Sequence, residues 1–195
     1  MKEYTIVRRA DWTQVPVLKM EGQLWPSNAD VAAQAQICYD NTALYVRLEA
    51  TEANIRKEHT DPLAEICEDS CLEFFFCPME TDDRYFNIEF NANGACYLGF
   101  GAGLPTLHRL IPEHPFIKPN VTFTESGWVL EYAIPYDFVR IFFPGFSPAS
   151  GKSIRANCYK CGELTEIPHW LCWNPIPEER ATFHCPEHFG LMHFA

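Results

Sequence analysis

Apolar and polar residues alternate along most of the chain, the pattern of β-strands that bury one face. Two alternating segments, 35–39 and 43–50, flank Asp40-Asn41, whose short polar side chains favour a tight turn. Further strands are predicted at 70–77, 84–91, 95–100, 121–124, 128–134, 152–161 and 190–194. A single short helix is predicted at 135–141, and residues 51–69, 101–119 and 162–189 are predicted to be loops. The pattern predicts an all-β fold, an antiparallel β-sandwich or jelly roll with long loops and one short helix.

Two of these strands separate apolar from polar side chains most clearly. Successive side chains of a strand point to opposite faces, so 70–77 presents Leu72, Phe74 and Phe76 on one face. Its other face carries Cys71, Glu73 and Phe75. Segment 84–91 likewise divides into a core trio and a polar set, namely Phe86, Ile88 and Phe90 against Tyr85, Asn87, Glu89 and Asn91. Asn93-Gly94 follows and predicts a type I′ hairpin turn.

The polar faces of three predicted strands supply candidate binding residues. These are Glu73, Asn87, Glu89, Arg155, Asn157 and Tyr159, which alternate along their strands and would share one concave sheet face. Sugar recognition needs such a network of carboxylates, amides and guanidinium groups, together with flat aromatic rings. The competing interpretation is a solvated outer face with surface ion pairs, the commoner fate of charges on strands.

Length and charge limit the classes of function. The 195 residues correspond to one domain, 1–195. Lys plus Arg is 15 and Asp plus Glu is 26, so the formal net charge is −11, which argues against nucleic acid and anionic membranes as partners. Aromatic residues make up 14% of the chain, more than a predicted core of this pattern requires, which leaves rings for a binding surface. Oligomeric state is not indicated by the sequence.

Five segments resemble carbohydrate-binding modules of family 9, particularly family-9-like proteins of bacterial polysaccharide users. They are EDSCLEFFF, YFNIEFNANG, GWVLEYAIP, RANCY and the terminal WNP and FHCPEHFG strings, in the family's order and spacing from about Trp12 to Phe194. The resemblance implies a β-sandwich that binds the ends of sugar chains, with aromatic rings stacked on the pyranose and strand polar groups on its hydroxyls. It also implies a non-catalytic role in carbohydrate catabolism.

The resemblance assigns roles to particular residues. The family's strand glutamate falls on Glu73, and a basic hydroxyl ligand of the next strand falls near Asn87, where this chain has no arginine. Of two stacking tryptophans, one falls near Ile66 or Cys67, where no aromatic residue stands, and the other falls on Phe183. Half of the aromatic clamp is therefore expected to be missing. Candidate replacements lie in the terminal loop: Trp170, Trp173, His169 and His184.

The sequence indicates no required cofactor, and it supports metal sites less strongly than a sugar site. The resemblance implies structural calcium, for which Asp40, Asn41, Asp82 and Asp83 supply oxygen ligands in turns. Zinc-like spacing occurs at Cys158-x-x-Cys161, His169-x-x-Cys172 and His184-Cys185-x-x-His188. In an extended strand, however, residues three apart point to opposite faces, so Cys158 and Cys161 converge only if the strand ends between them.

Two other classes of function remain open. The first is a glycoside-processing hydrolase or its accessory domain, in which Glu73 and Glu89 on neighbouring strands would be the paired carboxyl groups. The second is an interaction domain that has lost its sugar. Compartment is equally open, since nine cysteines, an odd number, and the lack of a leader favour a reducing cytoplasm, whereas the resembling proteins act outside the cell. Which sugar is bound does not follow from the sequence.

Overall fold

The computed structural model describes residues 1–177 and 182–195, and strands dominate the described part. The strands are β1 (Glu3–Arg8), β2 (Leu18–Lys19), β3 (Gly22–Gln23), β4 (Ala32–Tyr39), β5 (Ala43–Thr51), β6 (Cys71–Cys77), β7 (Tyr85–Asn91), β8 (Cys96–Gly101), β9 (His108–Arg109), β10 (Asn120–Phe123), β11 (Gly127–Pro135), β12 (Ser153–Gly162), β13 (His169–Cys172) and β14 (Gly190–Phe194). The helix α1 spans Tyr136–Phe142. Short 3-10 turns are η1 (Trp12–Gln14), η2 (Ile66–Glu68), η3 (Leu104–Thr106) and η4 (Pro186–His188).

The all-β sandwich and its single short helix are confirmed, and the predicted strands and helix fall within a few residues of their predicted positions. Two loop predictions were wrong. Residues 101–119 contain β9, which pairs antiparallel with β8, and residues 162–189 contain β13, which pairs antiparallel with β12. β13 has only four residues, His169–Cys172, directly after Pro168, and this is too short for an alternation of apolar and polar side chains to indicate a strand. The pairing with β12 supplies the hydrogen bonds that the local pattern does not indicate.

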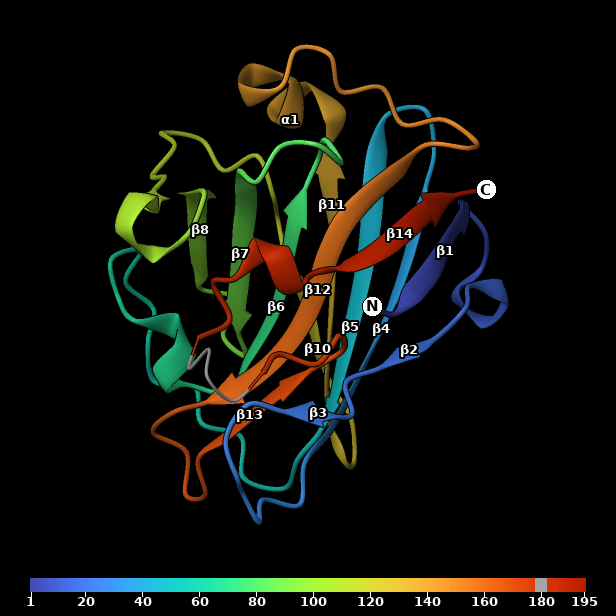
Figure 1. Cartoon of the computed structure of the whole chain (residues 1–195). Helices are drawn as coiled ribbons and strands as arrows, with labels where there is room; N and C mark the ends of the chain where they lie inside the picture. Colours follow the sequence, from blue (N-terminus) through green and yellow to red (C-terminus); the bar gives the residue numbers. More distant parts are fainter. Residues whose placement is uncertain (178–181) are drawn as a thin grey trace.

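The strands form two halves of a sandwich that meet at β1 (Figure 1). One half runs β10-β11-β5-β4 and the other β14-β12-β6-β7-β8-β9. β1 lies between the halves and pairs in parallel with both, through Glu3–Ile6 to β14 and through Val7–Arg8 to β4. Every other ladder along this path is antiparallel, so β1 alone departs from the antiparallel expectation by crossing from one half to the other.

The main core fills the space between the halves. Leu72, Phe74 and Phe76 of β6 are fully buried there, as their alternation predicts, and they face apolar residues of β4, β5 and β11. Helix α1 covers one end of the sandwich (Figure 1), where Phe138 packs against Phe86 with 5.0 Å between ring centroids. Among the described residues, no helix is long and apolar enough to cross a membrane.

The β7–β8 hairpin does not use the predicted type I′ turn. That turn needs a positive φ at both central residues, whereas only Gly94 has one, at 79°, and Asn93 does not. The Asn91 carbonyl accepts the Gly94 amide at 2.9 Å, and the Asn91 side-chain oxygen accepts the Ala95 amide at 2.9 Å. The loop is therefore one residue longer than predicted, and it sets which residues of β8 face Glu89.

Candidate functional site

The second face of β6, β7 and β12 carries the predicted polar residues, and it is not solvated. Glu73 is 2% exposed, Glu89 is 6% exposed and Asn87 is fully buried. A second apolar cluster covers this face, to which loop residues such as Leu24, Ile66, Phe183 and Phe189 contribute. The solvated interpretation of this face was therefore wrong, because loops that the sequence did not place fold over it.

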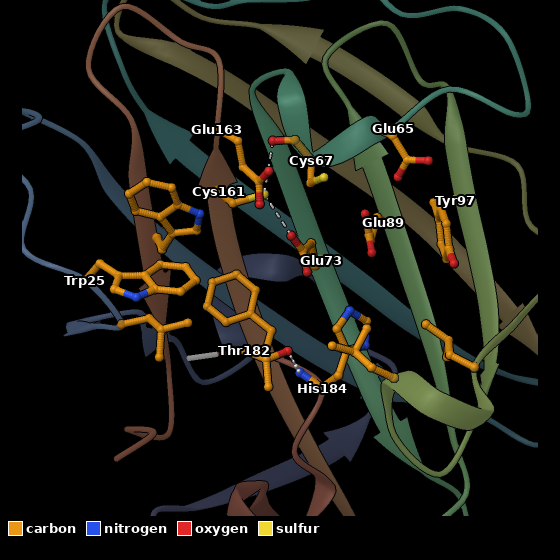
Figure 2. A pocket seen from close by; sticks show the side chains of 15 residues that line it. Trp25, Glu65, Cys67, Glu73, Glu89, Tyr97, Cys161, Glu163, Thr182 and His184 are labelled. Atoms are coloured by element: carbon orange, nitrogen blue, oxygen red, sulfur yellow. Dashed lines mark hydrogen bonds between the residues drawn. The ribbon is translucent and has the colours of Figure 1, made fainter. Parts of the chain in front are cut away.

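A cavity of about 280 Å³ opens between this face and the covering loops. Figure 2 shows Glu73 and Glu89 between two aromatic walls, with Trp25 on one side and Tyr97 on the other. The lining residues are Leu24, Trp25, Glu65, Cys67, Glu73, Glu89, Tyr97, Leu104, Leu107, Cys161, Glu163, Trp170, Thr182, Phe183 and His184. They come from segments far apart in the chain, so the sandwich and its loops together build the cavity.

Glu73 and Glu89 stand directly opposite each other in the antiparallel β6–β7 ladder. Burial, and then the neighbouring charge of Glu89, raises the pKa of Glu73 well above its ordinary value. Burial also raises the pKa of Glu89 to about 7, and the adjacent Asn87 amide offsets part of this rise. Burial thus favours the protonated form of Glu73, and Glu89 is close to half-titrated near neutral pH, so the pair offers both a hydrogen-bond donor and acceptors to a ligand.

Aromatic side chains from three segments line the cavity. Trp25, between β3 and β4, packs edge-on against Trp170 of β13, with ring centroids 4.8 Å apart and planes at 77°. Both tryptophans are half-buried, so part of each ring remains accessible. Phe183 is 9% exposed and stacks flat on Tyr159, with centroids 4.1 Å apart, so most of its surface supports the wall rather than facing the cavity.

His184 adds a neutral polar group to the wall. Burial lowers the pKa of its imidazole to about 4, so it carries no charge at neutral pH. Its Nδ1 shares a 2.8 Å hydrogen bond with the Tyr85 hydroxyl, which fixes the orientation of the ring. The second ring nitrogen is then left to pair with another group.

Five of the ten sequence-predicted sugar-binding residues line the cavity: Glu73, Glu89, Trp170, Phe183 and His184. Tyr159 supports Phe183 from behind, where its hydroxyl donates to the Phe183 carbonyl at 3.1 Å. Asn87 acts on the cavity through Glu89 and does not line it.

The other three predicted residues serve the scaffold. Arg155 donates to the backbone carbonyls of Asp82 and Pro186 and pairs with Asp83 at 2.8 Å. Asn157 pairs with the backbone of Asn174 in both directions. Trp173 is 3% exposed in the main core, against Tyr4. The structure thus does not bring Arg155, Asn157 or Trp173 to the cavity.

Two lining aromatics were missed by reasoning from the sequence. Trp25 lies in an N-terminal segment without strand pattern, and only the neighbouring Pro26 hints at a loop there. Tyr97 pairs with Glu89 across the β7–β8 ladder. A two-residue type I′ turn would instead set Tyr97 opposite Phe90, on the core side, so the wrong turn type concealed it. No aromatic residue stands near Ile66 and Cys67 in the sequence, and the rings in the described part of the wall come from other segments.

The proposed calcium ligands do not fit a bound cation. The Asp40 carboxylate accepts hydrogen bonds from Thr42, Ala43 and Tyr45, which holds its pKa at about 2. Asn41 accepts from Arg8. Asp82 is paired with Arg84, and Asp83 with Arg155. Protein donors already engage these oxygens, so the four residues do not form a calcium site.

The zinc-like spacing of Cys158 and Cys161 does not bring these two thiols together. Cys158 belongs to the main core, and Cys161 belongs to the cluster on the opposite face of β12. The strand continues through Gly162, so the geometric objection raised from the sequence is confirmed.

A β-sandwich that presents aromatic rings and buried carboxyl groups around a small cavity has the features of a carbohydrate-binding module. The family model described as carbohydrate-binding family 9 matches residues 6–194. The chain therefore belongs to carbohydrate-binding family 9, and it is a non-catalytic carbohydrate-binding module. A sequence search of curated proteins found no match.

Solved structures agree with this fold over the whole chain. A candidate carbohydrate-binding protein from Bacteroides uniformis is 25% identical, with a TM-score of 0.85 and coverage of 100% of this chain and 99% of that one. A family 9 module from Caldicellulosiruptor kristjanssonii in complex with glucose is 11% identical, with a TM-score of 0.70 and coverage of 100% and 96%. A family 9 module from the same organism in complex with cellotriose is also 11% identical, with a TM-score of 0.70 and coverage of 99% of this chain and 93% of that one.

Proposed function

We propose that the cavity on the outer face of β6, β7 and β12 binds the terminal residue of an oligosaccharide or polysaccharide. The supporting observation is the opposed pair Glu73 and Glu89, nearly fully buried yet open to a cavity with aromatic walls. Burying two carboxyl groups side by side opposes folding, and such an arrangement is typical of functional sites.

The two kinds of side chain would divide the recognition of a sugar between them. The accessible faces of Trp25, Trp170 and Tyr97 suit the C–H surface of a pyranose ring. Glu89 and protonated Glu73 would pair with its hydroxyl groups, which both donate and accept hydrogen bonds. A hydroxyl removed from the sugar would leave a buried carboxyl group unpaired, so this arrangement favours specificity as well as affinity.

The size of the cavity favours a chain end. Its volume of about 280 Å³ lies just below the usual range for ligand pockets. Strands β6, β7 and β12 close its base, because the face below belongs to the main core. Glucose and cellotriose, the ligands in two solved structures of family 9 modules from Caldicellulosiruptor kristjanssonii, are therefore the first ligands to test.

Isothermal titration calorimetry tests this function with gluco- and xylo-oligosaccharides and their reduced forms. Trp25→Ala and Trp170→Ala should each weaken binding about tenfold, the effect of one lost aromatic contact. Glu89→Gln should weaken it by roughly 10- to 100-fold, because a hydrogen bond to a charged group is lost.

Matched controls separate the site from the scaffold. Trp12→Ala removes a half-buried tryptophan outside the cavity, and Glu125→Gln neutralises an exposed glutamate. Both should bind as the wild type does. Equal affinity in the wild type, Trp170→Ala and Glu89→Gln would place the sugar elsewhere.

A further inference from the structure

Two thiols and a carboxyl group meet beneath the cavity, which Glu73 and Cys161 line and Cys71 does not. Cys71 and Glu73 lie two residues apart on the same face of β6, and Cys161 faces them from β12. The three ligand atoms lie within 4.8 Å of one another, and all three residues are buried. The Cys161 thiol donates a hydrogen bond to Glu73 Oε1 at 2.9 Å.

All three residues of this group lie on the paired strands β6 and β12, and none lies on a loop. Cys71 and Cys161 are directly opposed in the antiparallel β6–β12 ladder, which sets their Cβ atoms roughly 4.5 to 5.5 Å apart. Glu73 is opposite Tyr159, so its carboxyl group leans toward Cys161 from the next pair along the same face. A site whose ligands stand on paired strands loses little conformational entropy when an ion binds.

The group is accessible from the cavity. Glu73 and Cys161 line it, as does Cys67, whose carbonyl lies 3.6 Å from the Cys161 sulfur. An ion could therefore enter through the cavity, and its remaining coordination position would face the cavity. Three protein ligands with one exchangeable position is the usual composition of an open zinc site.

We propose that Cys71, Glu73 and Cys161 bind a thiophilic divalent cation of the zinc class. Two sulfur ligands and one carboxylate select zinc or cadmium, whereas calcium and magnesium require oxygen ligands. The spacing of cysteines along the sequence does not reveal this site, because its sulfur atoms come from residues 90 positions apart in the chain (161 − 71).

Binding would exchange protons for the metal. In the metal-free protein, burial raises the thiol pKa values of Cys71 and Cys161, so both thiols are protonated. The ion replaces these two protons and any proton on Glu73, and each sulfur donates its electron pair to the metal. The side chains of Glu89, Glu163, Lys160 and Cys67 surround the group.

The experiment uses the full chain, reduced and stripped of metal with a chelator. Zn²⁺ is titrated by calorimetry, and Cd²⁺ by the ultraviolet charge-transfer band that thiolate ligation produces. One equivalent should bind, with proton release. Cys71→Ser and Cys161→Ser should abolish the band, and Glu73→Gln should weaken binding at least tenfold.

Cys158→Ser is the matched control, because Cys158 is a buried cysteine of the same strand on its opposite face. It should bind one equivalent, as the wild type does. X-ray absorption of the zinc-loaded wild type needs no variant and should show two sulfur ligands, even if a serine variant fails to fold.

Three results would overturn the site. These are no saturable uptake, retained uptake in folded Cys71→Ser and Cys161→Ser, or a zinc shell without sulfur. A Cys71–Cys161 disulfide in the untreated protein, combined with no metal uptake after reduction, would identify the pair as a redox couple instead. Sugar binding is measured separately on the metal-free protein, so failure of one proposal leaves the other standing.

Discussion

Glu89 is 6% exposed and lies directly opposite Glu73 on the neighbouring strand. Its pKa is about 7, against an ordinary value of 4.5. In the unfolded chain this carboxyl group ionises freely, whereas in the folded protein burial keeps it protonated over a wider range of pH. The carboxyl group of Glu89 is thus well placed to hold a sugar hydroxyl, but its burial lowers the stability of the folded protein. Stability and binding are expected to oppose each other at this residue.

The variant Glu89→Gln should be more stable than the wild type at neutral and alkaline pH. Between pH 4.5 and about 7, the folded state holds a proton that the unfolded state has released, so the wild type loses stability as pH rises through this window. The glutamine variant lacks this loss and should gain roughly 1 to 3 kcal/mol in free energy of unfolding near pH 8.

Urea unfolding at about pH 4 and about pH 8 measures this difference. The gain should be absent at the lower pH, where both states are protonated. Glu125→Gln, at an exposed position, should show no gain at either pH. A Glu89→Gln variant less stable than the wild type at the higher pH would contradict the burial of an unfavourable carboxyl group.

At the scale of elements, the β7–β8 hairpin decides what reaches the cavity. Its ladder pairs Glu89 with Tyr97 and Phe90 with Cys96. A shift of one residue would send Tyr97 to the core side and Leu98 to the cavity. The length of the loop through Gly94 therefore determines one aromatic wall of the site.

Gly94→Ala tests the conformation of this loop. Gly94 has a φ of 79°, and an added Cβ would lie 3.3 Å from Pro119 Cγ. A side chain in the left-handed region costs about 1 to 2 kcal/mol, so the free energy of unfolding should fall by that amount. Gly145→Ala is the control, because no atom lies within 4 Å of its added Cβ, and its stability should be unchanged. Equal stability of the two variants would argue against the positive φ at Gly94.

At the scale of the whole molecule, alternation along the chain predicted most of the long strands of the sandwich, but not β1, which joins its two halves. It also divided β6 correctly, with Phe74 in the core and Glu73 on the other face. The walls of the cavity were predicted only in part, because Trp25 and the covering loops have no periodic pattern. Likewise, Trp173 and Arg155 have the residue types of a sugar site, yet long-range packing assigns them to the scaffold.

The meeting of Cys71 and Cys161 was also invisible in the sequence. Pairing between β6 and β12 depends on the order of strands in the sheet, which local patterns do not determine. Residue type and alternation thus predict the faces of single strands, while the site depends on which strands become neighbours.

The five tryptophans allow a direct test of where the sugar binds. Trp25 and Trp170 line the cavity, whereas Trp12, Trp128 and Trp173 do not. Their indole N–H signals, assigned with Trp→Phe variants, are followed by NMR during titration with glucose and cellotriose. We expect the signals of Trp25 and Trp170 to shift in a saturable manner while the other three stay in place. Saturable shifts confined to Trp12, Trp128 or Trp173, or no shift with any sugar, would contradict a carbohydrate site in this cavity.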